Sequence, residues 1–105
     1  MSSDTFRDLS EVDRLIHEPA RLLICTILYT VKEADFLFLL NESGLTKGNL
    51  SSHLAKLEEA GYITIRKSFN ERKPQTICSM TSKGRAAFEA YRENFKKIMQ
   101  KMNGE

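Results

Sequence analysis

The strongest constraint on the fold is a change of periodicity at Tyr62. Upstream of it, apolar residues recur at helical spacing. In the stretch YITIRKSF that begins there, Ile63 and Ile65 face one side while Thr64 and Arg66 face the other. This alternation with a period of two predicts a β-strand.

A second short strand follows in the sequence. The segment NERKPQ (residues 70–75) is polar and contains Pro74, which predicts a loop. TICSM (residues 76–80) then places Cys78 and Met80 on one face. The two strands are expected to pair as a hairpin with a basic tip.

Helices are predicted on both sides of this hairpin. A short helix is expected to begin at Asp4, followed by a largely apolar, buried helix in which Pro19 occupies the first turn or forms a kink in one continuous helix. Residues 32–44 predict a short helix that ends near Asn41. Thr46 is a candidate N-cap for a helix that ends at Gly61. Thr81 is a candidate N-cap for a long helix that runs to about Lys101. The expected fold is therefore α+β, mainly helical, with one domain over residues 1–105.

Composition and charge limit the function classes. The 105-residue chain is 41% hydrophobic and 29% charged, as is typical of a globular domain. Its N-terminus has no secretory signal pattern and no apolar run suits a membrane, so we expect a cytoplasmic protein with no membrane partner. Residues 1–60 carry six Lys/Arg and ten Asp/Glu, a balance of −4, whereas residues 61–101 carry ten and three, a balance of +7. A basic half is typical of nucleic-acid binding, although a solvated basic surface is the alternative.

The segment LTKGNLSSHLAKLEEAG (residues 45–61) has an unusually polar helix start. Leu50, Leu54 and Leu57 fall on one face and are expected to pack on the core. An α-helix fits the major groove of B-DNA, where short polar side chains near its N-terminus can contact base edges. Gly48 costs roughly 1 kcal/mol in a helix relative to Ala. Either close approach to a partner or tight packing against the preceding helix would explain it, and a simple capped surface helix is the plainer interpretation of the segment.

The stretch from Leu45 to Arg85 resembles the recognition helix, wing and last-helix start of MarR-type and ArsR-type transcriptional regulators. The most specific parts are LSSHLAKLEEAGYI and MTSKGR. The resemblance implies a winged helix-turn-helix fold, with a helical extension at 1–18, a winged core at 19–80 and a dimerisation helix at 81–105. It also implies two sets of DNA-contacting residues. The recognition helix supplies Thr46, Lys47, Gly48, Asn49, Ser51, Ser52, His53 and Lys56, and the wing supplies Arg66, Lys67, Asn70, Arg72 and Lys73.

The last helix carries an apolar seam with steps of three and four residues, formed by Phe88, Tyr91, Phe95, Ile98 and Met102. Part of such a seam would extend beyond a winged core, and an exposed aromatic stripe usually marks an interface. We therefore expect a homodimer held by this helix together with the first helices. The alternative is that the helix folds back on its own core.

No arrangement of residues predicts catalysis, a cofactor or a metal site. His17 and His53 belong to different elements, and Cys25 and Cys78 lie in apolar stretches that predict buried thiols. We therefore do not expect an enzyme. The favoured function is a sequence-specific double-stranded DNA-binding regulator that represses transcription as a homodimer, with its effector left open. The alternative is a winged-helix module that binds proteins rather than DNA.

Overall fold

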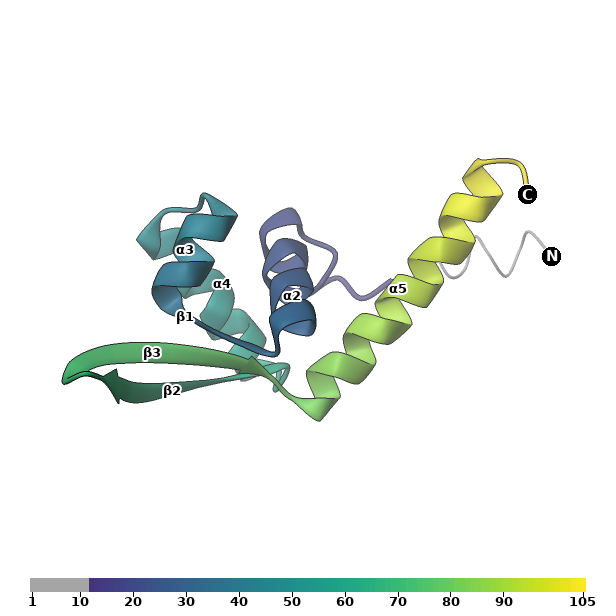
Figure 1. Cartoon of the computed structure of the whole chain (residues 1–105). Helices are drawn as coiled ribbons and strands as arrows, with labels where there is room; N and C mark the ends of the chain where they lie inside the picture. The colour runs from purple at the N-terminus through teal and green to yellow at the C-terminus, as the bar shows by residue number, and fades with distance from the viewer. Residues whose placement is uncertain (1–11) are drawn as a thin grey trace.

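The computed structural model describes residues 12–105, which form four helices and one sheet (Figure 1). In chain order the elements are α2 (Pro19–Val31), β1 (Glu33–Asp35), α3 (Phe36–Ser43), α4 (Lys47–Glu59), β2 (Ile63–Asn70), β3 (Lys73–Met80) and α5 (Ser82–Met102). The predicted α+β, mainly helical fold is confirmed. The helix expected to begin at Asp4 starts outside the described residues.

The segment before α2 differs from the helical extension that was expected. Residues 13–18 form turns, because the Asp13 carboxylate accepts hydrogen bonds from the backbone N–H groups of Leu15 (2.9 Å) and Ile16 (3.2 Å). Glu18 has an extended backbone and caps α2 by accepting from the Arg21 N–H at 2.9 Å. Pro19 therefore begins a new helix and does not kink a continuous one.

The sheet is antiparallel with strand order β1-β3-β2. The hairpin is longer than predicted, since the expected loop at 70–75 contracts to a turn at Glu71 and Arg72. Pro74 is accommodated within β3 opposite Phe69. Along an antiparallel ladder, residue pairs that exchange backbone hydrogen bonds alternate with pairs that do not. Asn70 and Lys73 close the turn as a hydrogen-bonded pair, so the next pair, Phe69 and Pro74, is not hydrogen-bonded. The Pro74 nitrogen therefore faces away from β2. β1 pairs only as far as Ile77, so no partner strand needs an N–H from Pro74.

The strand β1 is only three residues long and lies where the predicted helix at 32–44 was expected to begin, so that helix starts only at Phe36. Glu33, Ala34 and Asp35 pair with Ser79, Cys78 and Ile77. Its acidic side chains make their bonds to the sheet: Glu33 accepts from Ser79 Oγ at 3.2 Å, and Asp35 accepts from Gln75 Nε2 at 3.2 Å. Asp35 also caps α3 by accepting from the Phe38 N–H.

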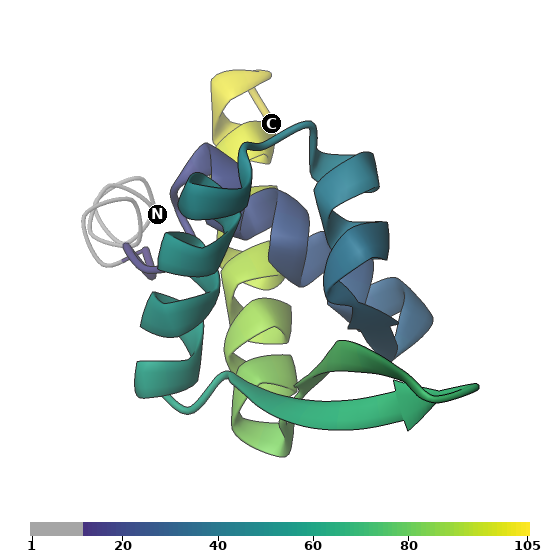
Figure 2. The ribbon, with the colours of Figure 1, turned by 90° about the vertical axis from the view of Figure 1, so that its left-hand side faces the viewer.

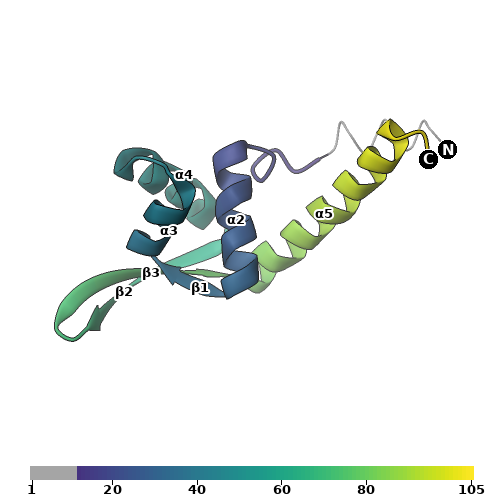
Figure 3. The same ribbon diagram turned by 45° about the horizontal axis from the view of Figure 1, so that its top comes forward.

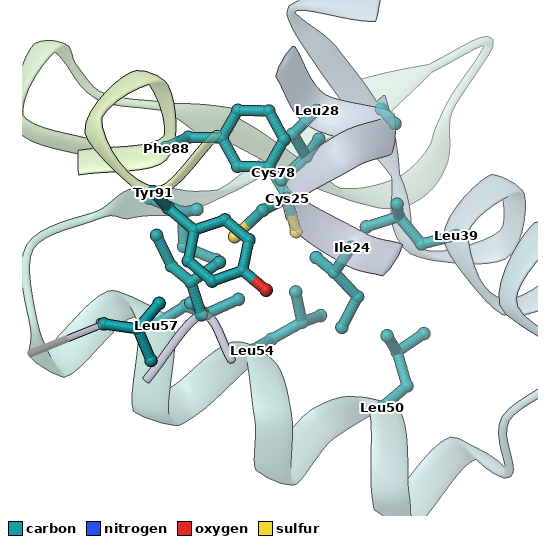
Figure 4. Close-up of a cluster of buried hydrophobic side chains, with 14 residues drawn as sticks. Ile24, Cys25, Leu28, Leu39, Leu50, Leu54, Leu57, Cys78, Phe88 and Tyr91 are labelled. Carbon is teal, nitrogen blue, oxygen red and sulfur yellow. The ribbon is translucent and has the colours of Figure 1, made fainter. Parts of the chain in front are cut away.

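The core lies between α2, α4, the sheet and the first half of α5 (Figure 4). The predicted leucine face of α4 is confirmed, because Leu50, Leu54 and Leu57 are all buried. The helix α2 is less enclosed than expected. Only one of its sides packs inward, so Leu23 and Val31 remain exposed.

The molecule is elongated, with extents of 57 × 25 × 20 Å. The hairpin projects at one end and the second half of α5 at the other (Figures 1 and 3). The start of α5 is fixed by Thr81, whose hydroxyl donates to the Gly61 carbonyl at 2.6 Å and whose backbone N–H donates to the Tyr62 carbonyl at 3.0 Å. Gly84 is required in the next turn, since a β-carbon there would collide with that Tyr62 carbonyl.

Candidate nucleic-acid interface

The start of α4 is set by a tight turn after α3. Gly44 adopts a left-handed φ of 70° and donates its N–H to the Leu40 carbonyl. Thr46 then caps α4 as predicted, because its hydroxyl accepts from the Asn49 N–H at 3.2 Å. The turn and cap hold the first turn of α4 at the surface, with its free backbone N–H groups pointing outward.

Almost the whole predicted recognition set is exposed. While the leucines of α4 point inward, the remaining members of the set reach solvent, namely Thr46, Lys47, Gly48, Asn49, Ser51, Ser52 and Lys56. The structure also excludes one of the two explanations for Gly48. A β-carbon on Gly48 would meet nothing within 4 Å, so the explanation by tight helix packing is wrong.

His53 is the member of the set that the structure places elsewhere. Its Nδ1 accepts from the Arg21 guanidinium at 3.1 Å and lies 3.9 Å from the Glu18 carboxylate. The Arg21 backbone N–H also donates to Glu18 and lowers the pKa of that carboxyl. Since its ring is directed toward the start of α2, His53 joins α4 to α2 and does not belong to the exposed polar face.

The hairpin formed by β2, the turn and β3, called the wing below, carries Lys67, Asn70, Arg72 and Lys73 on its exposed part. Its turn is unusual. Glu71 and Arg72 have φ values of 53° and 70°, a left-handed conformation that favours Gly and Asn. The sequence therefore keeps a cation at the tip despite an unfavourable backbone conformation.

Arg66 differs from the other wing residues. Its guanidinium donates to both oxygens of Glu33, at 3.2 and 3.5 Å. By strand alternation it lies on the face of the sheet opposite Ile63 and Ile65, which pack toward the core. The structure thus pairs Arg66 with β1 and separates it from the surface that faces α4.

The recognition helix and the wing share one hollow of about 330 Å³. Ser51, Ala55 and Glu58 of α4 line one side, and Ile65, Lys67 and Thr76 of the wing line the other. Within it the Lys67 ammonium donates to Thr76 Oγ1 at 3.0 Å. Viewed from the end toward which the hairpin projects, α4 and the wing both lie in front of α5 (Figure 2). One extended ligand approaching from this end can therefore contact both.

Comparison with known proteins agrees with this geometry. A family model described as a winged helix DNA-binding domain matches residues 20–99. The chain belongs to this family. The predicted winged helix-turn-helix fold is thereby confirmed, and both fold and family are those of DNA-binding regulators.

This winged helix protein is also similar to individual proteins and solved structures. The uncharacterized protein MJ0432 of Methanocaldococcus jannaschii is 37% identical over 78 residues, which cover 74% of this chain and 85% of that protein. The structure of a transcriptional regulator homologue from Pyrococcus horikoshii OT3 superposes with a TM-score of 0.86 at 26% identity, covering 91% of this chain and 97% of the other. A MarR-like transcription regulator of Bacillus cereus ATCC 10987 shares the fold, with a TM-score of 0.69 at 14% identity over 97% of this chain and 76% of its own.

The predicted seam on α5 is divided between core and surface. Phe88, Tyr91 and Ile98 are buried within the winged helix chain, so they are not the part of the seam that was expected to stay exposed. Tyr91 packs against Phe95 and its hydroxyl lies 2.8 Å from His17 Nδ1. Phe95 is only half-buried and Met102 is 73% exposed. Phe88 and Tyr91 at the start of the seam pack in the core, Ile98 is buried farther along α5, and Met102 at the end is exposed.

The cysteines of the winged helix are buried and free, as predicted. Burial raises the pKa of Cys25 to about 12 and that of Cys78 to about 11, which keeps both as unreactive thiols at neutral pH. Residues 12–105 contain no group of three side chains placed to bind a metal ion. In the same part of the chain no helix is both long and apolar enough to cross a membrane.

Phe69 of the wing is 73% exposed close to the turn, and no pattern noted in the sequence singled it out. It was placed within a strand, but the predicted loop began directly after it and hid its position near the tip. A large apolar side chain two positions before a turn is the pattern that would have indicated it.

Proposed function

We propose that this protein is a cytoplasmic transcriptional regulator that binds specific sites in double-stranded DNA as a homodimer and represses by occluding a promoter. The observation that carries the proposal is the shared hollow between α4 and the wing. It allows one duplex to meet the polar helix start and the basic hairpin at once.

The recognition helix is suited to the major groove. Lys47, Asn49, Ser51 and Ser52 are short or flexible donors on the exposed face of α4, where they can contact base edges. The unobstructed surface above Gly48 allows the helix backbone to come close to the groove floor. Specificity is assigned to this face, because base edges carry the sequence information.

The wing is suited to the DNA backbone. Lys67, Arg72 and Lys73 lie on the exposed hairpin, and each cation that neutralises a phosphate releases counterions from the duplex. Most of the affinity is assigned to these contacts. Binding should therefore depend strongly on salt.

The homodimer is assigned to the far end of α5 and the groove beside it. Leu22, Tyr91 and Phe95 line an apolar groove of about 390 Å³, and Met99 and Met102 beyond it are exposed. A second copy can cover these residues. Two recognition helices would then reach half-sites about 34 Å apart.

The proposal is tested by reversing charge on the wing. We expect Arg72→Glu/Lys73→Glu to weaken duplex binding by at least about tenfold and to flatten its salt dependence between about 50 and 200 mM. The matched control is Lys32→Glu/Lys97→Glu, which makes the same charge change at two exposed positions outside the wing, the recognition helix and the proposed dimer contact. Fluorescence anisotropy with a labelled duplex measures both, and circular dichroism checks the fold.

Equal losses in the two double variants would contradict the role of the wing and leave only a general effect of net charge. The second candidate function, a module that binds another protein, is supported by the exposed Leu37 and Phe38 on α3. Duplex binding by the unmodified protein that is absent or independent of salt would favour that candidate.

A further inference from the structure

The wing carries an exposed apolar pair close to its tip. Phe69 is 73% exposed and Pro74, its partner across the ladder, is also exposed. Only one residue of each strand separates this pair from the turn. Together the two side chains form an apolar surface at the end of the wing that a ligand can cover.

The pair faces the same way as the α4 side of the wing. Side chains alternate along a strand, so Phe69 shares a face with Ile65 and Lys67. Ile65 and Lys67 line the hollow opposite α4. The apolar pair therefore extends that surface outward along the hairpin.

The pair lies on a hairpin that is paired along its whole length and projects from the body. Eight residue pairs join β2 to β3, whereas β1 supports only the three that end at Ile77. The outer part of the hairpin thus stands clear of the body (Figure 3). Proline has a fixed φ and phenylalanine has only two side-chain torsions, so little conformational entropy is lost when the pair becomes enclosed.

The charges around the pair favour a polyanion as its occupant. Lys67 lies two residues before Phe69, and Arg72 and Lys73 lie between Phe69 and Pro74 in sequence, with Glu71 as the one acid in the turn. An apolar tip framed by cations fits a groove lined by phosphates. It is poorly suited to an uncharged protein surface.

We propose that Phe69, backed by Pro74, is a wedge that enters the minor groove of the bound duplex and partly unstacks one base step while the neighbouring cations hold the phosphates. This inference rests on the proposed function. Apolar wedges of this kind kink DNA by roughly 20–90°. Pyrimidine–purine steps unstack most easily, so the wing selects sites with such a step at the position it reaches, without hydrogen bonds to the bases.

The test compares variants at an exposed position that does not support the fold. The probe is a duplex of about 30 base pairs, with dyes at its ends for bending by energy transfer and 2-aminopurine beside a central TA step. Wild type should shorten the end-to-end distance and brighten the 2-aminopurine. Phe69→Ala should abolish both changes and lower affinity roughly tenfold, as expected when one stacking contact is lost. Phe38→Ala, on α3, is the matched control and should behave as wild type.

A second variant gives an independent readout. The chain contains no tryptophan, so Phe69→Trp places a unique fluorophore at the wedge. It should retain bending and be quenched on binding, and a stiff A-tract duplex should bind more weakly than the TA duplex. An unquenched tryptophan would overturn the wedge.

The outcomes separate the two proposals. Salt-dependent binding and bending that survive Phe69→Ala unchanged would overturn the wedge and leave the proposed function intact. If Phe69→Ala lowered the affinity but left the bending unchanged, the wedge would also be overturned, since Phe69 would then contact only the DNA backbone. The same holds if Phe69→Ala changed the sedimentation mass of the free protein, since Phe69 would then contact another protein chain. Failure of wild type to bind either duplex would refute the proposed function itself.

Discussion

At the scale of single residues, Gly48 separates the demands of folding from those of function. It sits in the first turn of α4 with open space where a β-carbon would be, so the fold gains nothing from a glycine there. A glycine in a helix loses more conformational entropy on folding than alanine does. In the proposed function, its presence is explained by a duplex that comes close to the backbone of α4.

Gly48→Ala should therefore make the protein more stable and a weaker DNA binder. We expect the free energy of unfolding to rise by roughly 0.4–1 kcal/mol, because the unfolded chain becomes less flexible. Duplex affinity should fall, because the added methyl group holds the helix away from the groove. Urea denaturation and duplex titration measure the two effects.

Gly84→Ala is the control for a glycine that the fold does require. Its β-carbon would collide with the Tyr62 carbonyl, so we expect a loss of about 1–3 kcal/mol of stability. Duplex affinity that is unchanged or higher in Gly48→Ala would contradict close approach at this position.

The roles of single residues could be predicted from the sequence only where these roles depend on neighbours in the chain. The cap at Thr46 and the leucine face follow from local spacing, and the structure has both. The partners of His53 and Arg66 lie 32 and 33 positions away, at Arg21 and Glu33. No local pattern could show that these two side chains are already bonded within the chain.

At the scale of elements, the turn of the wing combines strain with charge. Both central residues have positive φ, as a two-residue hairpin of this hand requires, yet neither is Gly or Asn. Left-handed backbone in such residues costs of order 1 kcal/mol each or more. The turn is therefore a place where stability can be improved in two ways with opposite effects on binding.

Glu71→Asn and Arg72→Gly should each raise stability by up to about 1 kcal/mol, because Asn and Gly tolerate the left-handed region. The first removes the acid at the tip and should strengthen duplex binding, and the second removes a cation and should weaken it. Thermal unfolding and anisotropy titration test the pair. A shift of affinity in the same direction for both would indicate that turn geometry, and not charge, governs the contact.

The hairpin was predictable as an element but its length was not. Alternation of apolar residues ends near Phe69, where the strands leave the body and no core selects a buried face. Pairing continues to Asn70 and Lys73 through backbone bonds alone. The strand β1 escaped prediction because three residues are too few to show a period and its partners on β3, Ile77 to Ser79, lie far along the chain.

At the scale of the whole molecule, the two ends have different roles in the proposal. The α4 and wing end is polar and basic, and the α5 end exposes Met99 and Met102. The sequence predicted a seam over the whole of α5, but the first half is used by the core. Periodicity shows which residues share a face of a helix and cannot show what covers that face.

Met99→Glu/Met102→Glu should dissociate the dimer. Two carboxylates at the proposed contact would have to be buried without partners, so sedimentation should shift from twice the 12.0 kDa chain mass to the chain mass, with an unchanged circular dichroism spectrum. Leu37→Glu, at a 63% exposed position on α3, is the control and should leave the mass unchanged. Loss of the dimer only in the α3 variant would place the interface on the other side of the molecule.

The central claim is that α4 and the wing contact one duplex together. An NMR titration of the ¹⁵N-labelled protein with duplex DNA tests it most directly, because each backbone amide reports separately. The backbone amides of residues 46–52 and 67–73 should shift together, at the same DNA ratio, while those of residues 98–103 at the end of α5 stay in place. Shifts confined to one of the two elements, or gathered on α3 or the end of α5, would contradict it.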